Sequence, residues 1–265
     1  MSSGGEKVCP LCGGTGFIIT PRGAKKCRCV YERFNVSKYL NIPKRFWDAD
    51  IRLVREILDE ESFETLKGFV KDFVTHYKKG VGLLLVGPQG VGKTYTAAAL
   101  LNYIYKKYGI RGLFTDTKEL SIKLRDYFSE QKTKGSIVEA LIKVPILVLD
   151  DLGNENLTDW YRDILTGIIT RRYNEKRVTI ITTNYYPSYL AIIRSGEETA
   201  KRISEKNWIP VVDKSSLTSP KRVVLTSEDL LLDKRFGSHI VSRLGEMTIP
   251  IIVNGRDKRI QKVVV

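Results

Sequence analysis

A short glycine-rich segment constrains this chain more than any other feature of its sequence. The segment GLLLVGPQGVGKTYTAAALL begins at Gly82, with an apolar run before the glycines and a helix-forming run after them. Gly87, Gly92, Lys93 and Thr94 fit the spacing G-x-x-x-x-G-K-[ST], in which backbone N–H groups surround a phosphate at a helix N-terminus. The segment therefore predicts a strand–loop–helix unit that binds a nucleoside triphosphate.

Each part of this loop has an expected task. The glycines let the backbone curl close to an anion. Lys93 is expected to reach the β- and γ-phosphates, and the Thr94 hydroxyl is expected to bind Mg²⁺. The predicted nucleotide-binding residues are Gly87, Gly90, Val91, Gly92, Lys93, Thr94 and Tyr95.

Strand-sized apolar runs alternate with helical patterns after residue 81. The runs are VGLLLVG, RGLFTD, ILVLDD and VTIITTN, and TIPIIVNG near the end is a candidate fifth strand. Such alternation predicts an α/β fold with a parallel sheet covered by helices on both faces. Before this region, apolar residues between Phe63 and Tyr77 recur at three- and four-residue steps, which predicts one helix.

Polar side chains end two of the predicted strands. Asp150 and Asp151 end PILVLDD, and Asn184 ends VTIITTN. Ligands of open α/β sheets bind at this edge, so Asp150 is expected to hold Mg²⁺ and Asp151 to polarise the attacking water. Aspartate is one methylene shorter than glutamate, and slow intrinsic hydrolysis is expected for that reason. Asn184 is a candidate for positioning water or contacting the γ-phosphate.

The balance of charges points to a polyanionic partner. Lys and Arg number 44 against 30 Asp and Glu, which gives a formal charge of +14. Nucleic acid is the commonest partner of so basic a chain. No apolar run approaches the roughly 20 residues that cross a bilayer. A cytoplasmic protein without membrane contact is therefore expected.

Four cysteines near the N-terminus have the spacing of a metal site. Cys9, Cys12, Cys27 and Cys29 form the pattern C-x₂-C…C-x-C, and two close thiol pairs suit tetrahedral zinc. A segment this small cannot fold on its own core, so zinc would have to stabilise it. The predicted organisation is a zinc module at 1–33, a linker and N-terminal helix at 34–80, and an ATPase core at 81–265 with an insertion at 185–234.

The order of these motifs separates the chain from several classes of phosphate-loop protein. It has neither the N-K-x-D guanine reader of GTPases nor the L-S-G-G-Q signature of transporter ATPases. The phrases NIPKRFWDADI, LVLDDLGNENLTDWYRDIL, TIITTNYYP and SRLGEM, together with the phosphate loop, resemble the AAA+ ATPases of the DnaC/DnaI helicase-loader and IstB family. The resemblance runs from about Ile42 to the C-terminus, outside the insertion.

The resemblance implies roles for further residues. Asn184 matches the family's sensor, and Arg243 in SRLGEM matches an arginine finger that completes a neighbouring subunit's site. An ATP-dependent oligomer follows if Arg243 acts in trans. In the initiator and loader branch, helices between the second and third strands contact single-stranded DNA. The basic residues in that position are Lys118, Lys123, Arg125, Lys132 and Lys134. Tyr127 and Phe128 beside them are expected in the core.

The sequence favours a zinc-bearing AAA+ ATPase that binds ATP, Mg²⁺ and single-stranded DNA and loads a replicative helicase. An IstB-like transposition helper that binds duplex DNA is the nearest alternative. A phosphate-loop kinase acting on a small molecule is the alternative from another class, and a DNA-binding module without turnover is a fourth. The zinc motif, the net charge and the position of Asn184 disfavour the kinase.

Overall fold

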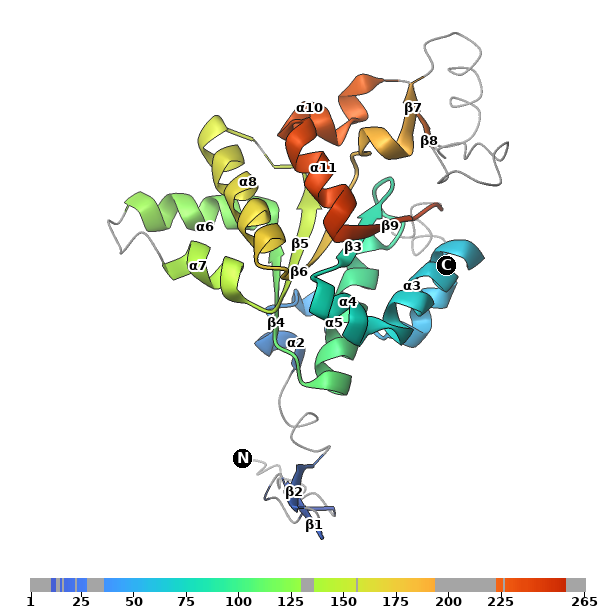
Figure 1. The fold of residues 1–265 in the computed structure, drawn as a ribbon, viewed down its shortest axis with the longest axis vertical. Coiled ribbons are helices and arrows are strands. Elements are labelled where there is room, and N and C mark those ends of the chain that lie inside the picture. The colour runs from blue at the N-terminus through green and yellow to red at the C-terminus, as the bar shows by residue number, and fades with distance from the viewer. Residues whose placement is uncertain are drawn as a thin grey trace, which may run out of the picture.

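Five parallel strands form the centre of the protein in a computed structural model (Figure 1). They are β3 (Gly82–Val86), β4 (Gly112–Asp116), β5 (Ile146–Leu152), β6 (Val178–Thr183) and β9 (Thr248–Ile252), in the spatial order β4-β5-β6-β3-β9. Every neighbouring pair is parallel, which confirms the predicted sheet and its fifth strand. Because β3, β6 and β5 are neighbours, the loops that follow them meet at one edge.

The structure describes residues 11–12, 15, 17–21, 23–27, 36–129, 136–155, 157–193, 223–225 and 227–255. Four residues singled out in the sequence, Cys9, Cys29, Lys132 and Lys134, lie outside these ranges. No helix in the described ranges is long and apolar enough to cross a membrane.

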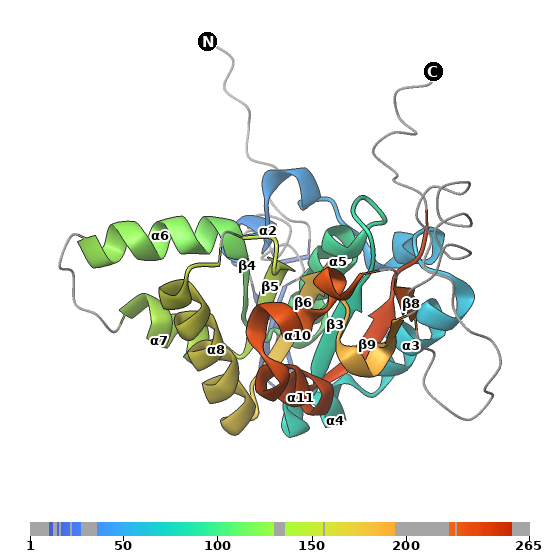
Figure 2. The ribbon, with the colours of Figure 1, turned by 90° about the horizontal axis from the view of Figure 1, so that it is seen from above.

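Helices cover both faces of the sheet (Figure 2). Alternate residues of β3 point to opposite faces, so Leu83 and Leu85 join one apolar cluster while Leu84 and Val86 join the other. The first cluster includes α3 (Glu60–Lys71), α4 (Phe73–Lys79) and α5 (Lys93–Tyr108). The second includes α6 (Thr117–Ser129), α7 (Ser136–Lys143), α8 (Asp159–Asn174), α10 (Leu232–Phe236) and α11 (Ser238–Met247).

The apolar stripe from Phe63 to Tyr77 forms two helices, so the prediction of one helix was wrong. The break falls at Asp72, whose backbone (φ −99°, ψ 21°) ends α3 and begins α4. The stripe nevertheless stays continuous across the break. The ring of Phe73 lies 6.0 Å from that of Phe69 and 5.8 Å from that of Tyr77. The aromatic side chains of the stripe therefore stay in contact on both sides of the break at Asp72, because their spacing is kept.

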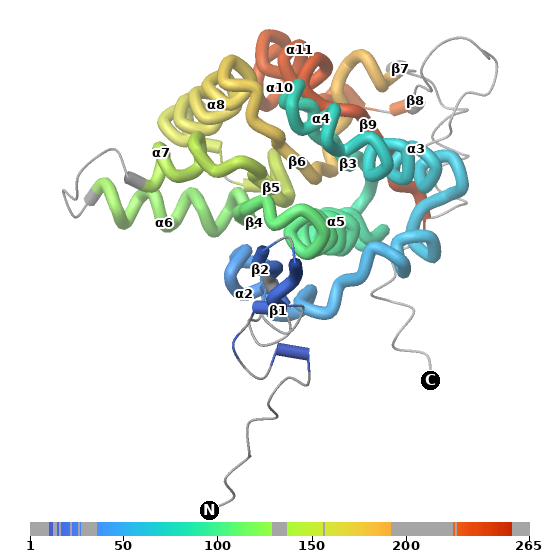
Figure 3. Tube along the Cα trace, turned by 60° about the horizontal axis from the view of Figure 1, so that its bottom comes forward, coloured from blue at the N-terminus to red at the C-terminus, as the bar shows by residue number. Residues whose placement is uncertain are grey.

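The region before the sheet has two parts, of which the part from residue 36 onward packs into the first apolar cluster, whereas the hairpin has a small cluster of its own. Its elements are the hairpin β1 (Phe17–Thr20) and β2 (Gly23–Lys26), the short helix α2 (Val36–Tyr39), and the 3₁₀ turns η1 (Lys44–Phe46) and η2 (Ile51–Glu56). Leu40 and Val54 are fully buried in the first cluster. Figure 3 shows α2 beside α5, with which it is in contact.

Both ends of the 185–234 segment also contact the core. η3 (Ser188–Leu190) and β7 (Ala191–Ile193) open it, and β8 (Val223–Leu225) and η4 (Glu228–Leu230) come before α10. β7 and β8 pair in parallel. Tyr186 and Leu232 are fully buried in the second cluster, so this part of the segment belongs to the folded core.

Candidate functional site

The phosphate loop has the backbone that its glycines predict. α5 begins at Lys93, and its N-cap Gly92 has a left-handed φ of 107°. A Cβ at Gly92 would lie 2.5 Å from the Ile57 side chain, and one at Gly87 would lie 2.1 Å from the Val253 carbonyl oxygen. Both positions therefore require glycine, and the first turn of α5 presents its unpaired N–H groups to the loop.

Lys93 is held by oxygen atoms around the loop. Its ammonium donates to the carbonyl oxygens of Gly87 (2.8 Å) and Pro88 (2.6 Å) and to Asn184 Oδ1 (2.7 Å). The side chain is buried. The ammonium group of Lys93 is therefore held at the base of the loop, which is the position from which a phosphate-loop lysine contacts the β- and γ-phosphates.

Asp150 is a buried carboxylate at the end of β5. Its Oδ1 accepts a hydrogen bond of 2.6 Å from the Thr182 hydroxyl. Burial raises the pKa of Asp150 to about 6, while hydrogen bonds from Thr182 and Thr94 act in the opposite direction. A carboxylate that burial disfavours and that faces the loop threonine suits a cation, since hard oxygen ligands are what Mg²⁺ prefers.

Asp151 occupies a strained position beside it. The pairing of β5 with β6 is irregular between Leu149 and Leu152, and Asp151 has a φ of 61°. A left-handed backbone at a non-glycine residue is typical of functional sites. Its N–H donates to Thr182 Oγ1 (2.8 Å), and its Oδ1 accepts from Asn154 (2.7 Å) and from Asn184 (3.4 Å).

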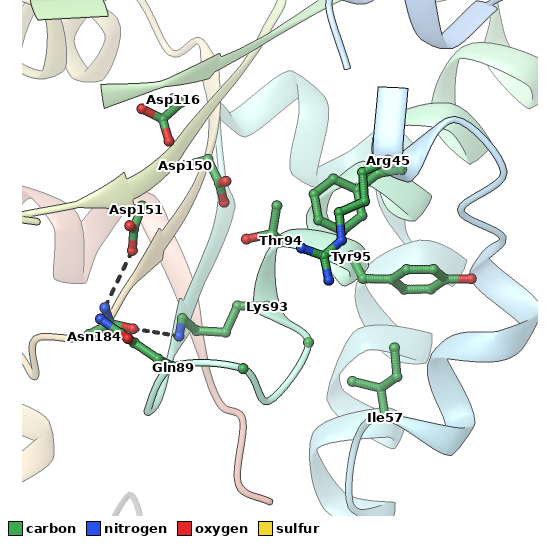
Figure 4. A pocket seen from close by; sticks show the side chains of 13 residues that line it. Arg45, Ile57, Gln89, Lys93, Thr94, Tyr95, Asp116, Asp150, Asp151 and Asn184 are labelled. Carbon is green, nitrogen blue, oxygen red and sulfur yellow. Dashed lines mark hydrogen bonds between the residues drawn. The ribbon is translucent and has the colours of Figure 1, made fainter. Parts of the chain in front are cut away.

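These residues line one cavity of about 590 Å³ (Figure 4). Of the residues predicted for the site, the cavity brings together Gly90, Gly92, Lys93, Thr94, Tyr95, Asp150, Asp151 and Asn184. Gly87 contacts Lys93 from the loop, and Val91 packs into the core. The volume lies within the range of about 300–1,000 Å³ typical of small-molecule sites.

Sequence reasoning missed five residues that line this cavity, one of which, Gln89, lies within the phosphate loop itself. Asp116 ends β4 and lines the cavity, and the strand-end rule that found Asp150 would have found it too. Arg45, Phe46 and Ile57 reach the cavity from η1 and the residue after η2. No periodicity in the sequence marks these three residues as site residues. Arg45 and Ile57 lie on the side of the cavity away from Asn184, toward which Lys93 points (Figure 4).

Comparison with known proteins explains this arrangement. Residues 21–189 match the family described as IstB-like ATP binding protein. The chain belongs to this family. An IstB-like chain is thus an ATP-binding protein, and its α/β sheet and phosphate loop are those of its relatives.

Relatives of the IstB-like chain include a helicase loader and an ATP-binding protein of an insertion sequence. The replicative helicase loader DnaI of Bacillus subtilis is 34% identical over 128 residues, or 46% of this chain and 40% of DnaI. An insertion sequence ATP-binding protein of Sinorhizobium fredii is 37% identical over 106 residues, or 40% of this chain and 35% of the relative. The chain thus matches less than half the length of these curated relatives.

Solved structures agree with the family assignment. The crystal structure of the DnaC helicase loader is 34% identical, has a TM-score of 0.56, and is matched over 80% of this chain and 99% of its own. The DnaI structure has a TM-score of 0.54 at 23% identity, over 80% of this chain and 94% of its own, which shows a common fold.

The remaining predicted residues of the IstB-like chain lie away from the cavity. Arg243 is on α11, where Ile240, Val241 and Leu244 face the core. Its side chain is half-buried, and its guanidinium donates to the carbonyl oxygen of His239 (3.0 Å) in a hydrogen bond at the surface. It does not line the cavity of its own chain. Lys118, Lys123 and Arg125 are exposed on α6, and Lys123 forms a 2.6 Å ion pair with Glu119.

Two of the four cysteines are described, and they pack together. Cys27 is fully buried and lies in a small cluster with Cys12 and Ile18 at the β1–β2 hairpin. Among the residues that the structure describes, no group of three or more His, Cys, Asp or Glu side chains could hold a metal ion. Cys9 and Cys29 are outside those residues, and the predicted zinc site stays a prediction.

Proposed function

We propose that this IstB-like protein is an ATP-dependent replicative helicase loader that binds single-stranded DNA. The observation that carries the proposal is an aromatic surface beside the predicted basic residues, which we define as Tyr127, Phe128 and Trp160. Trp160, the second residue of α8, is 40% exposed, although its spacing from Ile164 and Ile168 predicts that it belongs to one apolar stripe of that helix. Its ring lies edge-on to Phe128, with centroids 5.4 Å apart.

An exposed aromatic surface favours single-stranded DNA over duplex DNA. Unpaired bases stack on aromatic rings, whereas the bases of a duplex are already stacked on each other. Tyr127 and Phe128 are half-buried, so the expectation that they lie in the core holds only in part. Lys118 and Arg125 are exposed on the same helix and would neutralise phosphates, and Lys123 would do so by exchanging its ion pair with Glu119.

The nucleotide site supplies the proposed chemistry. Thr94 and Asp150 would hold Mg²⁺, which neutralises charge on the β- and γ-phosphates when bound. The fit rests on oxygen donors at hand, because Asp116 and Asp151 line the same cavity. Lys93 would release its carbonyl partners and bind the phosphates. Asp151 would orient the attacking water, and Asn184, which bonds both Lys93 and Asp151, would position the two.

Completion of this site requires a second copy of the chain. Arg243 on α11 is the proposed arginine finger, and its hydrogen bond to the His239 carbonyl oxygen lies at the surface, where a neighbouring chain would approach. ATP binding would then favour an oligomer that grips DNA and the helicase, and hydrolysis would release the helicase. Slow hydrolysis is expected from a single chain, since Lys93 is the one cation that lines the γ-phosphate end of the cavity among the described residues.

Anisotropy of labelled oligonucleotides tests the proposal. Single-stranded and duplex DNA are each measured with an ATP analogue, with ADP and without nucleotide, at one stated salt concentration. We expect single-strand binding that requires the ATP analogue. Trp160→Ala should weaken it about tenfold, since stacking contributes about 1–3 kcal/mol per base. Leu53→Ala, an exposed apolar residue on η2, is the control and should have no effect.

Other outcomes select other functions. ATP-dependent binding of duplex DNA would favour a transposition helper, which the insertion-sequence relative also suggests. Absence of DNA binding in all nucleotide states would leave a small-molecule kinase. Retention of the bound helicase after Lys93→Ala would argue against a nucleotide-driven loader.

The N-terminal module at 1–33 is proposed to bind zinc through Cys9, Cys12, Cys27 and Cys29. The close packing of Cys12 with buried Cys27 supports the site, because two thiols from the two pairs already adjoin. Elemental analysis of the purified protein should find about one zinc ion per chain. Cys27→Ser should lose it. A metal-free protein with four titratable thiols would exclude the site.

A further inference from the structure

A cation on η1 faces the nucleotide cavity from outside the phosphate loop. Arg45 lines the cavity together with Thr94 and Tyr95, and Figure 4 shows its guanidinium directed toward Thr94. Its recorded contact is with the Phe46 ring, whose centroid is 5.7 Å from the guanidinium carbon. Arg45 forms no ion pair with any residue in the described ranges. Its charge is therefore available to a ligand.

The segment that carries Arg45 is fixed to the helix that follows the loop. The Asp50 N–H donates to the Tyr95 hydroxyl (3.2 Å), which belongs to the first turn of α5. Further along α5, Asn102 donates to the Ala49 carbonyl oxygen (3.5 Å). Ser37 donates to both the Trp47 carbonyl oxygen (2.9 Å) and Asn102 Oδ1 (3.1 Å). Arg45 thus has a defined place relative to the phosphate-binding turn.

The two cations of the cavity lie at different ends of it. Lys93 points toward Asn184, whereas Arg45 lies on the side of Tyr95 and the apolar residue Ile57 (Figure 4). Phe46, whose ring contacts Arg45, lines the same cavity. A nucleotide with its terminal phosphate at Lys93 would direct its base toward that apolar end. Between base and terminal phosphate, the group that passes Arg45 is the α-phosphate.

The charged side chains around the cavity favour Arg45 as a second group that binds phosphate. The cavity lining includes three carboxylates, Asp116, Asp150 and Asp151, but only two cationic side chains. Lys93 is engaged with three oxygen atoms. Guanidinium groups suit phosphate oxygens because their planar N–H donors form two parallel bonds.

We propose that Arg45 binds the α-phosphate of the nucleotide and retains ATP and ADP alike. The inference rests on the proposed nucleotide site at the phosphate loop. The two cations then have different tasks. Lys93 contacts the terminal phosphate and so distinguishes ATP from ADP, whereas Arg45 binds both nucleotides. Release of ADP after hydrolysis would then depend on Arg45.

Nucleotide affinities of matched variants test this inference. Calorimetry gives the Kd of ADP and of a non-hydrolysable ATP analogue for Arg45→Ala, Arg45→Lys and Lys44→Ala. Lys44 is the control, because it neighbours Arg45, is exposed and does not line the cavity. Arg45→Ala should weaken both nucleotides about tenfold, as expected for loss of a charge-assisted hydrogen bond. Arg45→Lys should recover part of the affinity. Lys44→Ala should bind both nucleotides with unchanged affinity.

The outcomes distinguish this inference from the site itself. Lys93→Ala should abolish binding of both nucleotides, and unchanged binding there would overturn the nucleotide site. Normal affinity in Arg45→Ala, with Lys93→Ala inactive, would overturn only the role of Arg45. A loss confined to the ATP analogue would overturn the assignment to the α-phosphate, because it would put Arg45 at the terminal phosphate.

Discussion

Replacement of Arg172 by methionine tests how a buried cation without a carboxylate stabilises this fold. Arg172 lies in α8 and is fully buried, and burial lowers its pKa to about 9. Its guanidinium makes five hydrogen bonds of 2.6–3.0 Å to uncharged acceptors. They are the carbonyl oxygens of Leu141, Ile142, Val144 and Val178 and the hydroxyl of Thr179.

The geometry sets the size of the expected effect. Two of the acceptors belong to the last turn of α7, so the cation also lies at the negative end of a helix dipole. Each carbonyl left buried without a donor costs about 1–3 kcal/mol, and relief of the buried charge offsets part of the sum. We expect Arg172→Met to lower the free energy of unfolding by about 3–4 kcal/mol, which corresponds to a fall in Tm of about 6–16 °C.

Urea unfolding followed by circular dichroism measures the difference. The adjacent Arg171 is the control, since its side chain is 48% exposed and pairs with Glu139 and Glu175. Arg171→Met should change stability by less than about 1 kcal/mol because exposed ion pairs contribute little. If Arg172→Met unfolds within 1 kcal/mol of that control, apolar packing replaces the five hydrogen bonds and the reasoning is refuted.

Three further predictions concern the sheet and its edge. Because the folded-state pKa of Asp150 is raised from 3.8 to about 6, the metal-free protein should lose about 2 kcal/mol of stability as pH rises from 4 to 7, and Asp150→Asn should not show this loss. Thermal melts in chelator check it, and equal pH profiles would contradict it. Gly82→Ala should prevent folding, because its Cβ would lie 1.8 Å from a carbonyl oxygen of β6, whereas Gly167→Ala, with open space on α8, should raise stability by about 0.5–1 kcal/mol. Soluble yield and urea midpoints distinguish the two. Thr117→Val should cost about 1–3 kcal/mol of stability by removing a hydrogen bond to buried Glu155, and Thr117→Ser, which keeps the hydroxyl, should retain most of that stability. A larger loss in Thr117→Ser than in Thr117→Val would show that the methyl group matters instead.

The part of the site that follows local rules was predictable from sequence. The phosphate loop is defined by spacing within eight residues, and Asp150, Asp151 and Asn184 follow from strand ends that meet at one edge. Arg45 could not be found in this way. It lies more than forty residues before the loop and reaches the cavity only because the preceding segment packs on α5.

Packing beyond one element explains the other differences. The spacing of Trp160 gives the face of α8 on which it lies, but it does not say how far neighbouring elements cover that face. Phe128 contacts Trp160 edge-on and leaves 40% of the residue exposed. Thr182 was missed because its hydroxyl matters only once β5 and β6 are adjacent, where it bonds both Asp150 and Asp151.

Thr117 joins the nucleotide edge to the aromatic surface. As the first residue of α6, it donates to the Asp151 carbonyl oxygen (3.1 Å) and to Glu155 (2.8 Å), and its own carbonyl accepts from Tyr161, which adjoins Trp160. If this contact couples the two sites, linkage requires that each ligand change the other's affinity by the same factor. A tenfold tighter grip on DNA in the ATP state would then mean tenfold tighter ATP on DNA, so the strand itself would prolong the loaded state.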